Sequence, residues 1–347
     1  MIGGVKLNIK SVAKKAGVSV ATVSRVLNHP DAVAPDTKEH ILNIMESLDY
    51  TPNWFARGLK LNRTGVIALL IPEILDIGYM EIAKGVEDVA HQKKYNIMLC
   101  STEEDRNKEK GYIENFISRK VDGIVLVSSL LKNNDLNQIK KQDVAVVLIG
   151  KNDEIIGENL VYTDYKAATT EAVKHMIEIG HRKIGMIYGN RPKIENIDKL
   201  EGFKRTMEDE GLVYHEKHIV EEENSFEGGY LAASKLLNLK DRPEAIFVTS
   251  DTMAIGAMEK IKQTDLQIPQ DIAVVGFDNL KISAFIEPKL TTVAKPMYRM
   301  GLIAARLLFD LMEDENQKDN EPQEILIQSK LKVRKSCGHR DRLKEIF

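Results

Sequence analysis

The sequence has too little cysteine for a disulfide framework or a cysteine-based metal site. Cys100 and Cys337 are its only cysteines, whereas structural zinc sites need four ligands at close spacing. Long apolar runs are also missing: none approaches the ~18 residues of a membrane span, and the N-terminus lacks a signal-peptide core. We therefore expect a cytoplasmic protein that contacts no membrane and carries no metal and no cofactor.

The signatures of common catalytic sites are missing as well. No GxGxxG follows the first apolar run, and the GxxxxGK[ST], HExxH and GxSxG motifs do not occur. His215 and His218 lie three residues apart in a charged stretch without a third ligand, so we interpret them as solvated surface residues rather than metal ligands. These absences argue against an enzyme.

The N-terminal segment has the spacing of a helix-turn-helix. A helical apolar face over residues 9–16 includes the small Ala13, and Gly17 then breaks the helix where a left-handed conformation is needed. Ser19 is placed to cap a second helix, whose inward residues include Val23. A close crossing, a turn and a locking valine are what two helices in this motif require. A third helix over 36–48 would close the core.

The second helix, residues 20–28, is therefore predicted to lie in a DNA major groove. Residues 1–64 hold nine basic and five acidic residues, and the remainder is acidic, which fits nucleic-acid binding by the head alone. Arg25 is the natural partner of guanine O6 and N7. Val20 and Ala21 offer apolar contacts to bases, and Thr22 and Ser24 suit phosphates. Ser19 is a further candidate DNA contact. The alternative is a three-helix bundle without a DNA role.

A conditional helix is predicted directly after this bundle, in the stretch YTPNWFARGL at 50–59. Helices shorter than about 12 residues are marginal in isolation, and Gly58 weakens this one further. We expect the segment to become helical only when another surface holds it. A segment of this kind, placed between a DNA-reading head and a larger body, can couple the two.

The motifs VSVATVSRVLN and YTPNWFARGL resemble the recognition helix and hinge of the LacI/GalR family of bacterial transcription regulators. The resemblance implies that paired hinge helices enter the minor groove at the centre of the operator. Leu59 would then wedge a base step open and bend the DNA. It also implies DNA contacts from Asn53, Ala56 and Arg57. The alternative for Leu59 is an ordinary core leucine.

Beyond residue 64, short apolar runs such as GVIALLIP and GIVLVSS alternate with helical stretches, and the pattern restarts after residue 163. Buried parallel strands that alternate with helices predict an α/β fold with two doubly wound lobes and a ligand cleft between them. Motifs such as AIFVTSDTMAIGAM and IPQDIAVVGFDN extend the family resemblance here, which implies lobes of periplasmic-binding-protein type. The predicted parts are a helix-turn-helix domain (1–52), a hinge helix and linker (53–64), an N-lobe (65–163 plus 294–322), a C-lobe (164–293 plus 323–336) and a tail (337–347).

The resemblance also places effector contacts in the cleft. The matching residues are Lys199 and Asp278, together with Asp251 and Phe226, although Asp278 could instead be a structural cap. Asn224 stands where the family has an aromatic platform, and Ser250 where an amide is common. Because sugars are usually held by aromatic faces and bidentate polar groups, this cleft departs from an ordinary sugar site. The effector is expected to be a sugar or a phosphosugar.

The stretches EIAKGVEDVAHQKKYNIML and KPMYRMGLIAARLL resemble the catabolite control branch of the family. The resemblance implies a second partner, a seryl-phosphorylated phosphocarrier protein that docks at Tyr298 and Arg306. An arginine can fork two hydrogen bonds onto a phosphoserine; the alternative is a merely solvated side chain. The tail has no heptads for a zipper, so a homodimer is expected.

The predicted function is that of a dimeric transcription regulator. It is expected to repress carbon-metabolism genes by binding a pseudo-palindromic DNA operator. The alternative is a sugar or phosphosugar sensor whose main activity is ligand binding and whose DNA affinity is weak. Calorimetry with phosphosugars and with the phosphorylated carrier protein would identify the effector.

Overall fold

The computed structural model describes residues 8–28, 30–50, 63–189, 194–313 and 321–338. It divides into two compact units, Met1–Thr64 and Gly65–Phe347. None of the helices in the described ranges combines the length and the apolar character that crossing a membrane requires.

The first unit is a small helical head. Its elements are α1 (Ile9–Ala16), α2 (Val20–Asn28), η1 (Pro30–Ala32) and α3 (Pro35–Ser47). The helices enclose one buried cluster, formed by Val12, Ala13, Ala16, Val23, Val26, Ile41 and Met45. This is the three-helix core that the apolar spacing predicted, with α3 beginning one residue earlier than expected.

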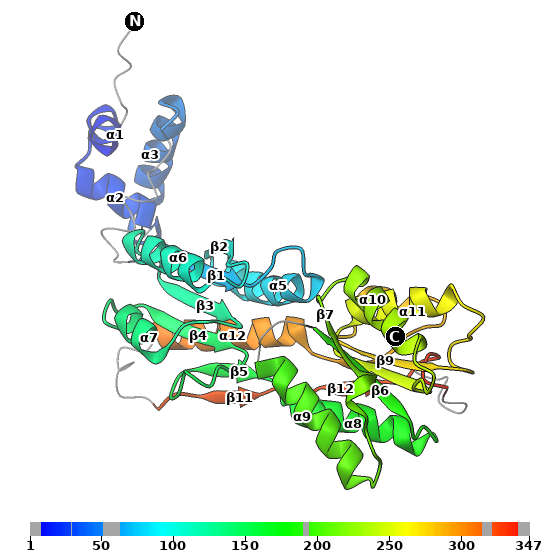
Figure 1. Ribbon diagram of the computed structural model, residues 1–347. Coiled ribbons are helices and arrows are strands. Elements are labelled where there is room, and N and C mark those ends of the chain that lie inside the picture. Colours follow the sequence, from blue (N-terminus) through cyan, green and yellow to red (C-terminus); the bar gives the residue numbers. More distant parts are fainter. Residues whose placement is uncertain (1–7, 29, 51–62, 190–193, 314–320, 339–347) are drawn as a thin grey trace, which may run out of the picture. The chain divides into compact units, whose positions relative to one another are not determined.

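The second unit contains two lobes, each built on a six-stranded sheet with helices on both faces (Figure 1). The first sheet is parallel throughout, in the order β11-β5-β4-β3-β1-β2. Its strands are β1 (Val66–Ile71), β2 (Asn96–Ser101), β3 (Gly123–Val127), β4 (Ala145–Ile149), β5 (Leu160–Tyr162) and β11 (Glu324–Leu326). One face packs on α5 (Ile77–Gln92) and α12 (Met297–Glu313), and the other on α6 (Arg106–Ser118) and α7 (Asn133–Lys140).

The second sheet repeats this plan in the order β12-β10-β9-β8-β6-β7, with β12 antiparallel to β10. Its strands are β6 (Ile184–Gly189), β7 (Ile219–Glu222), β8 (Ala245–Val248), β9 (Ala273–Phe277), β10 (Thr291–Ala294) and β12 (Lys330–Lys332). Its helices are α8 (Tyr165–Glu178) and α9 (Ile194–Asp209) on one face, and α10 (Phe226–Leu237) and α11 (Asp251–Lys262) on the other. Two short 3-10 helices, η2 (Glu216–His218) and η3 (Lys281–Ala284), lie in its loops. The predicted α/β class with two doubly wound lobes is confirmed.

The chain crosses between the lobes three times. The first crossing lies between β5 and α8 and the second between β10 and α12, near residues 163 and 294 as predicted. The third was expected at 323, but β11 still belongs to the first sheet, so the chain crosses between residues 326 and 330. The physical reason is edge pairing: β11 covers the free edge of β5, and Ile325 packs against the core of the first lobe.

Candidate DNA-reading helix and interlobe cleft

The turn between α1 and α2 has the geometry that the sequence predicted. Gly17 adopts φ 65° and ψ 26°, in the left-handed region, and the backbone N–H of Val18 donates to the carbonyl of Ala13 at 3.1 Å. The side chain of Ala13 is 4% exposed and that of Val23 is fully buried. The small alanine lets the two helices approach, and the glycine permits the turn that sets their crossing.

Helix α2 begins with a side-chain cap. The hydroxyl oxygen of Ser19 accepts from the backbone N–H of Thr22 at 3.1 Å, and the two hydroxyls lie 2.8 Å apart. Ser19, Val20, Ala21 and Arg25 are exposed, whereas Thr22 and Ser24 are half-buried. The inward face is apolar, since Val23 and Val26 are buried. The outward face of the first two turns therefore offers two small apolar groups, hydroxyls and one guanidinium, which suits base-edge and phosphate contacts.

The predicted hinge contacts Asn53, Ala56, Arg57 and Leu59 lie outside the described residues. The structure is silent on them, so their roles stay predictions.

A small cleft lies between the two lobes, at the carboxyl ends of their strands, where open parallel sheets bind ligands. Its cavity volume is about 50 Å³. The cleft is lined by Asp76, Tyr79, Glu195, Asn196, Lys199, Asn224, Thr249, Ser250, Asp278, Lys295 and Met297. Two of the four predicted effector residues, Lys199 and Asp278, are therefore part of the lining.

Lys199 is buried within α9, and Asp278 is half-buried in an unusual backbone conformation. The Lys199 ammonium donates to the carbonyl of Thr249 at 3.0 Å and lies 4.1 Å from the centre of the Phe277 ring. Asp278 has φ 109°, a backbone conformation that side chains rarely adopt and that is often found at functional sites. Burial raises the pKa of Asp278 to about 8, although Lys199 and Lys295 act in the opposite direction. The raised pKa favours the protonated carboxyl group, which can donate a hydrogen bond.

The other two predicted effector residues, Asp251 and Phe226, do not line the cleft. Asp251 is fully buried and accepts hydrogen bonds from the backbone N–H of Leu280 and from the hydroxyls of Ser283 and Thr292, at 2.6–2.9 Å. Burial raises the pKa of Asp251 to about 6. The carboxylate thus fastens η3 and β10 to the start of α11, which favours a structural role. Phe226 begins α10 and is half-exposed.

Sequence reasoning missed Glu195 and Lys295. The Lys295 ammonium lies 3.5 Å from Oε2 of Glu195 and 4.9 Å from the centre of the Tyr165 ring. Lys295 directly follows β10, and a polar residue at the carboxyl end of a strand is a signal that could have found it. Glu195 lies in the first turn of α9, and no local pattern marks it.

The prediction that His218 is a solvated surface residue is wrong. His218 is buried rather than solvated, and its Nε2 lies 2.7 Å from the carbonyl oxygen of Asp241. Among the described residues, no group of histidine, cysteine or acidic side chains is arranged to hold a metal ion.

Tyr298 and Arg306 both lie on the exposed side of α12, which packs along α5. The Tyr298 hydroxyl donates to Asp88 at 2.9 Å, and this bond raises the pKa of Tyr298. Lys84 pairs with the same aspartate at 2.7 Å. The surface around Arg306 therefore carries charges of both signs.

Comparison with known proteins identifies both units. Residues 8–53 match the family model described as bacterial regulatory proteins, lacI family, and residues 173–337 match a periplasmic binding protein-like domain. Catabolite control protein A of Priestia megaterium is 37% identical over 310 residues, covering 89% of this chain and 93% of that protein.

Two solved structures show the same architecture. A complex of the transcriptional regulator CelR with cellobiose is 27% identical, with a TM-score of 0.71, and covers 95% of this chain and 100% of that one. The lac repressor dimer bound to operator and the anti-inducer ONPF has a TM-score of 0.84 at 24% identity, covering 95% and 99%. This second likeness concerns the fold alone.

Proposed function

Because the chain belongs to the lacI family of bacterial regulatory proteins, we propose that it reads operator DNA through the outward face of α2. The chain is a DNA-binding transcriptional regulator rather than an enzyme, as are the relatives that it matches. We place its action in the cytoplasm, where that DNA is found.

The observation that carries the proposal is the division of α2 into two faces. Val23 and Val26 are buried in the head, while Val20, Ala21 and Arg25 point outward from the first two turns. Those are the turns that a recognition helix presents to base edges. Arg25 has the only long cationic side chain of α2, so discrimination of guanine falls to it.

Arg25 is tested by two substitutions after selection of an operator from random DNA. Arg25→Ala should cost about 1–3 kcal/mol of binding free energy and relax the preference at one base pair per half-site. Arg25→Lys keeps the charge but loses the planar fork, so it should relax the same preference while retaining more affinity. If Arg25→Ala weakens binding to all sequences uniformly, Arg25 is a phosphate contact and the proposed reading is wrong.

The operator is proposed to be pseudo-palindromic and bound by a homodimer, since a two-fold protein matches two half-sites. Within this dimer, the segment from Asn53 to Leu59 is proposed to become helical on the operator. The spacing of the paired lobes would then set whether the two hinge helices form. Such coupling is typically worth about 1–3 kcal/mol.

The interlobe cleft is the proposed effector site, with Lys199 and Asp278 as its first contacts. A buried ammonium and a protonated carboxyl group suit hydroxyl and phosphate oxygens, so we propose a sugar or phosphosugar. Calorimetry with free and phosphorylated hexoses tests this: loss of the heat signal in Lys199→Met supports the assignment, and unchanged binding contradicts it. Lys166→Met is the matched control, because Lys166 pairs with Asp198 and Glu201 outside the cleft lining.

A second proposed signal is a seryl-phosphorylated phosphocarrier protein docked at Tyr298 and Arg306. The exposed guanidinium on α12 can pair with a phosphoserine, and likeness to a catabolite control protein supports this choice. Arg306→Glu should abolish calorimetric binding of the phosphorylated carrier. Arg205→Glu, at an exposed arginine of α9, should leave it unchanged, and equal binding by both variants would reject the docking site.

A further inference from the structure

One carboxylate touches both lobes of the body. Ser128 follows β3 of the first lobe, and its hydroxyl donates to Oε1 of Glu195, on α9 of the second lobe, at 3.4 Å. Oε2 of Glu195 lies 3.5 Å from the ammonium of Lys295, in the segment that crosses from β10 to α12. Glu195 therefore joins the first lobe, the second lobe and a crossing segment.

The ion pair between Glu195 and Lys295 is largely shielded from solvent. The side chain of Lys295 is 5% exposed and that of Glu195 is 16% exposed. Charge pairs with so little exposure are screened less by salt than surface pairs, and removing one partner leaves the other charge uncompensated. This contact should consequently matter more than the many exposed ion pairs of the molecule.

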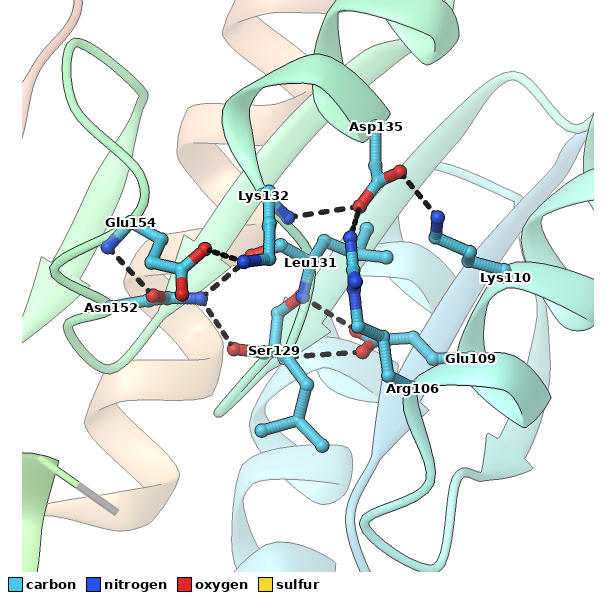
Figure 2. A network of polar contacts seen from close by, with 10 residues as sticks. Arg106, Glu109, Lys110, Ser129, Leu131, Lys132, Asp135, Asn152 and Glu154 are labelled. Atoms are coloured by element: carbon cyan, nitrogen blue, oxygen red, sulfur yellow. Dashed lines mark hydrogen bonds and ion pairs between the residues drawn. The ribbon is translucent and has the colours of Figure 1, made fainter. Parts of the chain in front are cut away.

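Hydrogen bonds from neighbouring segments hold the loop that carries Ser128, as the polar network in Figure 2 shows. Ser129 donates to Glu109 at 2.6 Å, and the side-chain amide of Asn152 donates to the carbonyls of Ser129 and Leu131, both at 2.9 Å. Ser128 itself adopts φ 46°, a conformation that costs energy outside glycine. The network therefore holds the hydroxyl in place for Glu195 rather than leaving it on a free loop.

The cleft beside this contact is nearly filled by the protein's own side chains. Its cavity of about 50 Å³ compares with roughly 300 Å³ or more for ordinary ligand pockets. A cavity of this size admits a few water molecules but is too small for a hexose. In this arrangement Glu195 pairs with the ammonium group of Lys295 inside the cleft, where a ligand would otherwise contact it.

We propose that Glu195 is a built-in clamp that keeps the two lobes closed through Ser128 and Lys295. A ligand enters only when this contact opens. The clamp rests on the two-lobed regulator body of the proposed function, because there the lobe spacing carries the signal. It adds a named residue that sets the closed state in the absence of any effector.

Hydrogen exchange followed by mass spectrometry on the full chain tests the clamp. Glu195→Gln keeps the shape but removes the negative charge, which breaks the pair with Lys295 and weakens the hydrogen bond from Ser128. The amides of residues 128–131, 295 and 297–300 should therefore exchange roughly threefold to tenfold faster. Glu201→Gln is the matched control: it lies on the same helix, and its pair with Lys166 joins α9 to α8 within the second lobe, at 2.6 Å. This control should leave both segments unchanged.

A second comparison separates clamping from general loosening. Lys295→Met should speed amide exchange in the same two segments, and the double variant should show little further acceleration, because both changes break the same Glu195–Lys295 pair. The clamp is rejected if Glu195→Gln leaves the interlobe amides at the wild-type rate, if Glu201→Gln has the same effect, or if the two changes add fully. Operator binding by the wild-type chain is measured alongside: its absence would overturn the regulator, whereas unchanged exchange in Glu195→Gln would overturn the clamp alone.

Discussion

Gly17→Ala tests whether the α1–α2 turn depends on backbone conformation alone. Gly17 has φ 65°, and an added Cβ would meet no atom within 4 Å. The cost of alanine is therefore the left-handed conformation itself, about 1–2 kcal/mol, with no steric term. A head of about 40 residues has roughly 2–6 kcal/mol of stability in total. The substitution should leave the head folded at 25 °C but greatly weakened.

The assay is hydrogen exchange of the α2 amides, residues 20–28, in the full chain. Because 1–2 kcal/mol corresponds to a factor of about 5–30 in the folded-to-unfolded ratio, Gly17→Ala should speed their exchange by that factor. Gly111→Ala is the matched control: Gly111 also has open space around its Cβ, but it lies within helix α6, where alanine stabilises by about 0.5–1 kcal/mol. Unchanged exchange in Gly17→Ala, or equal acceleration in both variants, would refute the reasoning.

Three further predictions concern the cap, the cleft and the hinge. Ser19→Ala removes the acceptor for Thr22 N–H and should cost the head about 1 kcal/mol, seen as faster α2 exchange; Ser11→Ala, which leaves the Asn8 cap of α1 bonded to the backbone, should have a smaller effect. The pKa of Asp278 is raised from 3.8 to about 8, so this group destabilises the folded state increasingly as the pH rises from about 4 to 8. The melting temperature of Asp278→Asn, relative to that of the wild type, should therefore rise over this pH range and then level off. A difference that does not change with pH would contradict the raised pKa. Leu59→Ala should abolish operator bending in a gel assay while circular dichroism of the head stays unchanged, and retained bending would exclude the wedge.

Much of the fold could be predicted because the relevant signals are local. The apolar runs GVIALLIP and GIVLVSS were expected to be buried strands, and their residues 66–71 and 123–127 form β1 and β3. The third crossing was misplaced because β11 and β12 are three residues long. Segments as short as EIL and KLK carry no periodic signal, and only their pairing with distant strands defines them.

The candidate sites divide in the same way. Gly17, Ser19 and Val23 act within one turn-and-helix unit, so their spacing was enough to predict their places. The cleft assembles residues more than a hundred positions apart, and Glu195 has no neighbours in the sequence that indicate its contact with Lys295. Asp251 illustrates a different limit: the family resemblance implied a ligand contact, whereas three donors inside the lobe occupy its carboxylate.

The central claim, that α2 reads a major-groove edge through Arg25, is tested most directly by altering the DNA. Replacing guanine with 7-deazaguanine at the base pair whose preference Arg25→Ala relaxes removes one major-groove acceptor and leaves the phosphates intact. Wild-type affinity should fall about tenfold, within the ~1–3 kcal/mol of a bidentate contact, whereas Arg25→Ala should bind both DNAs equally. Equal binding of both DNAs by the wild-type protein would contradict the account.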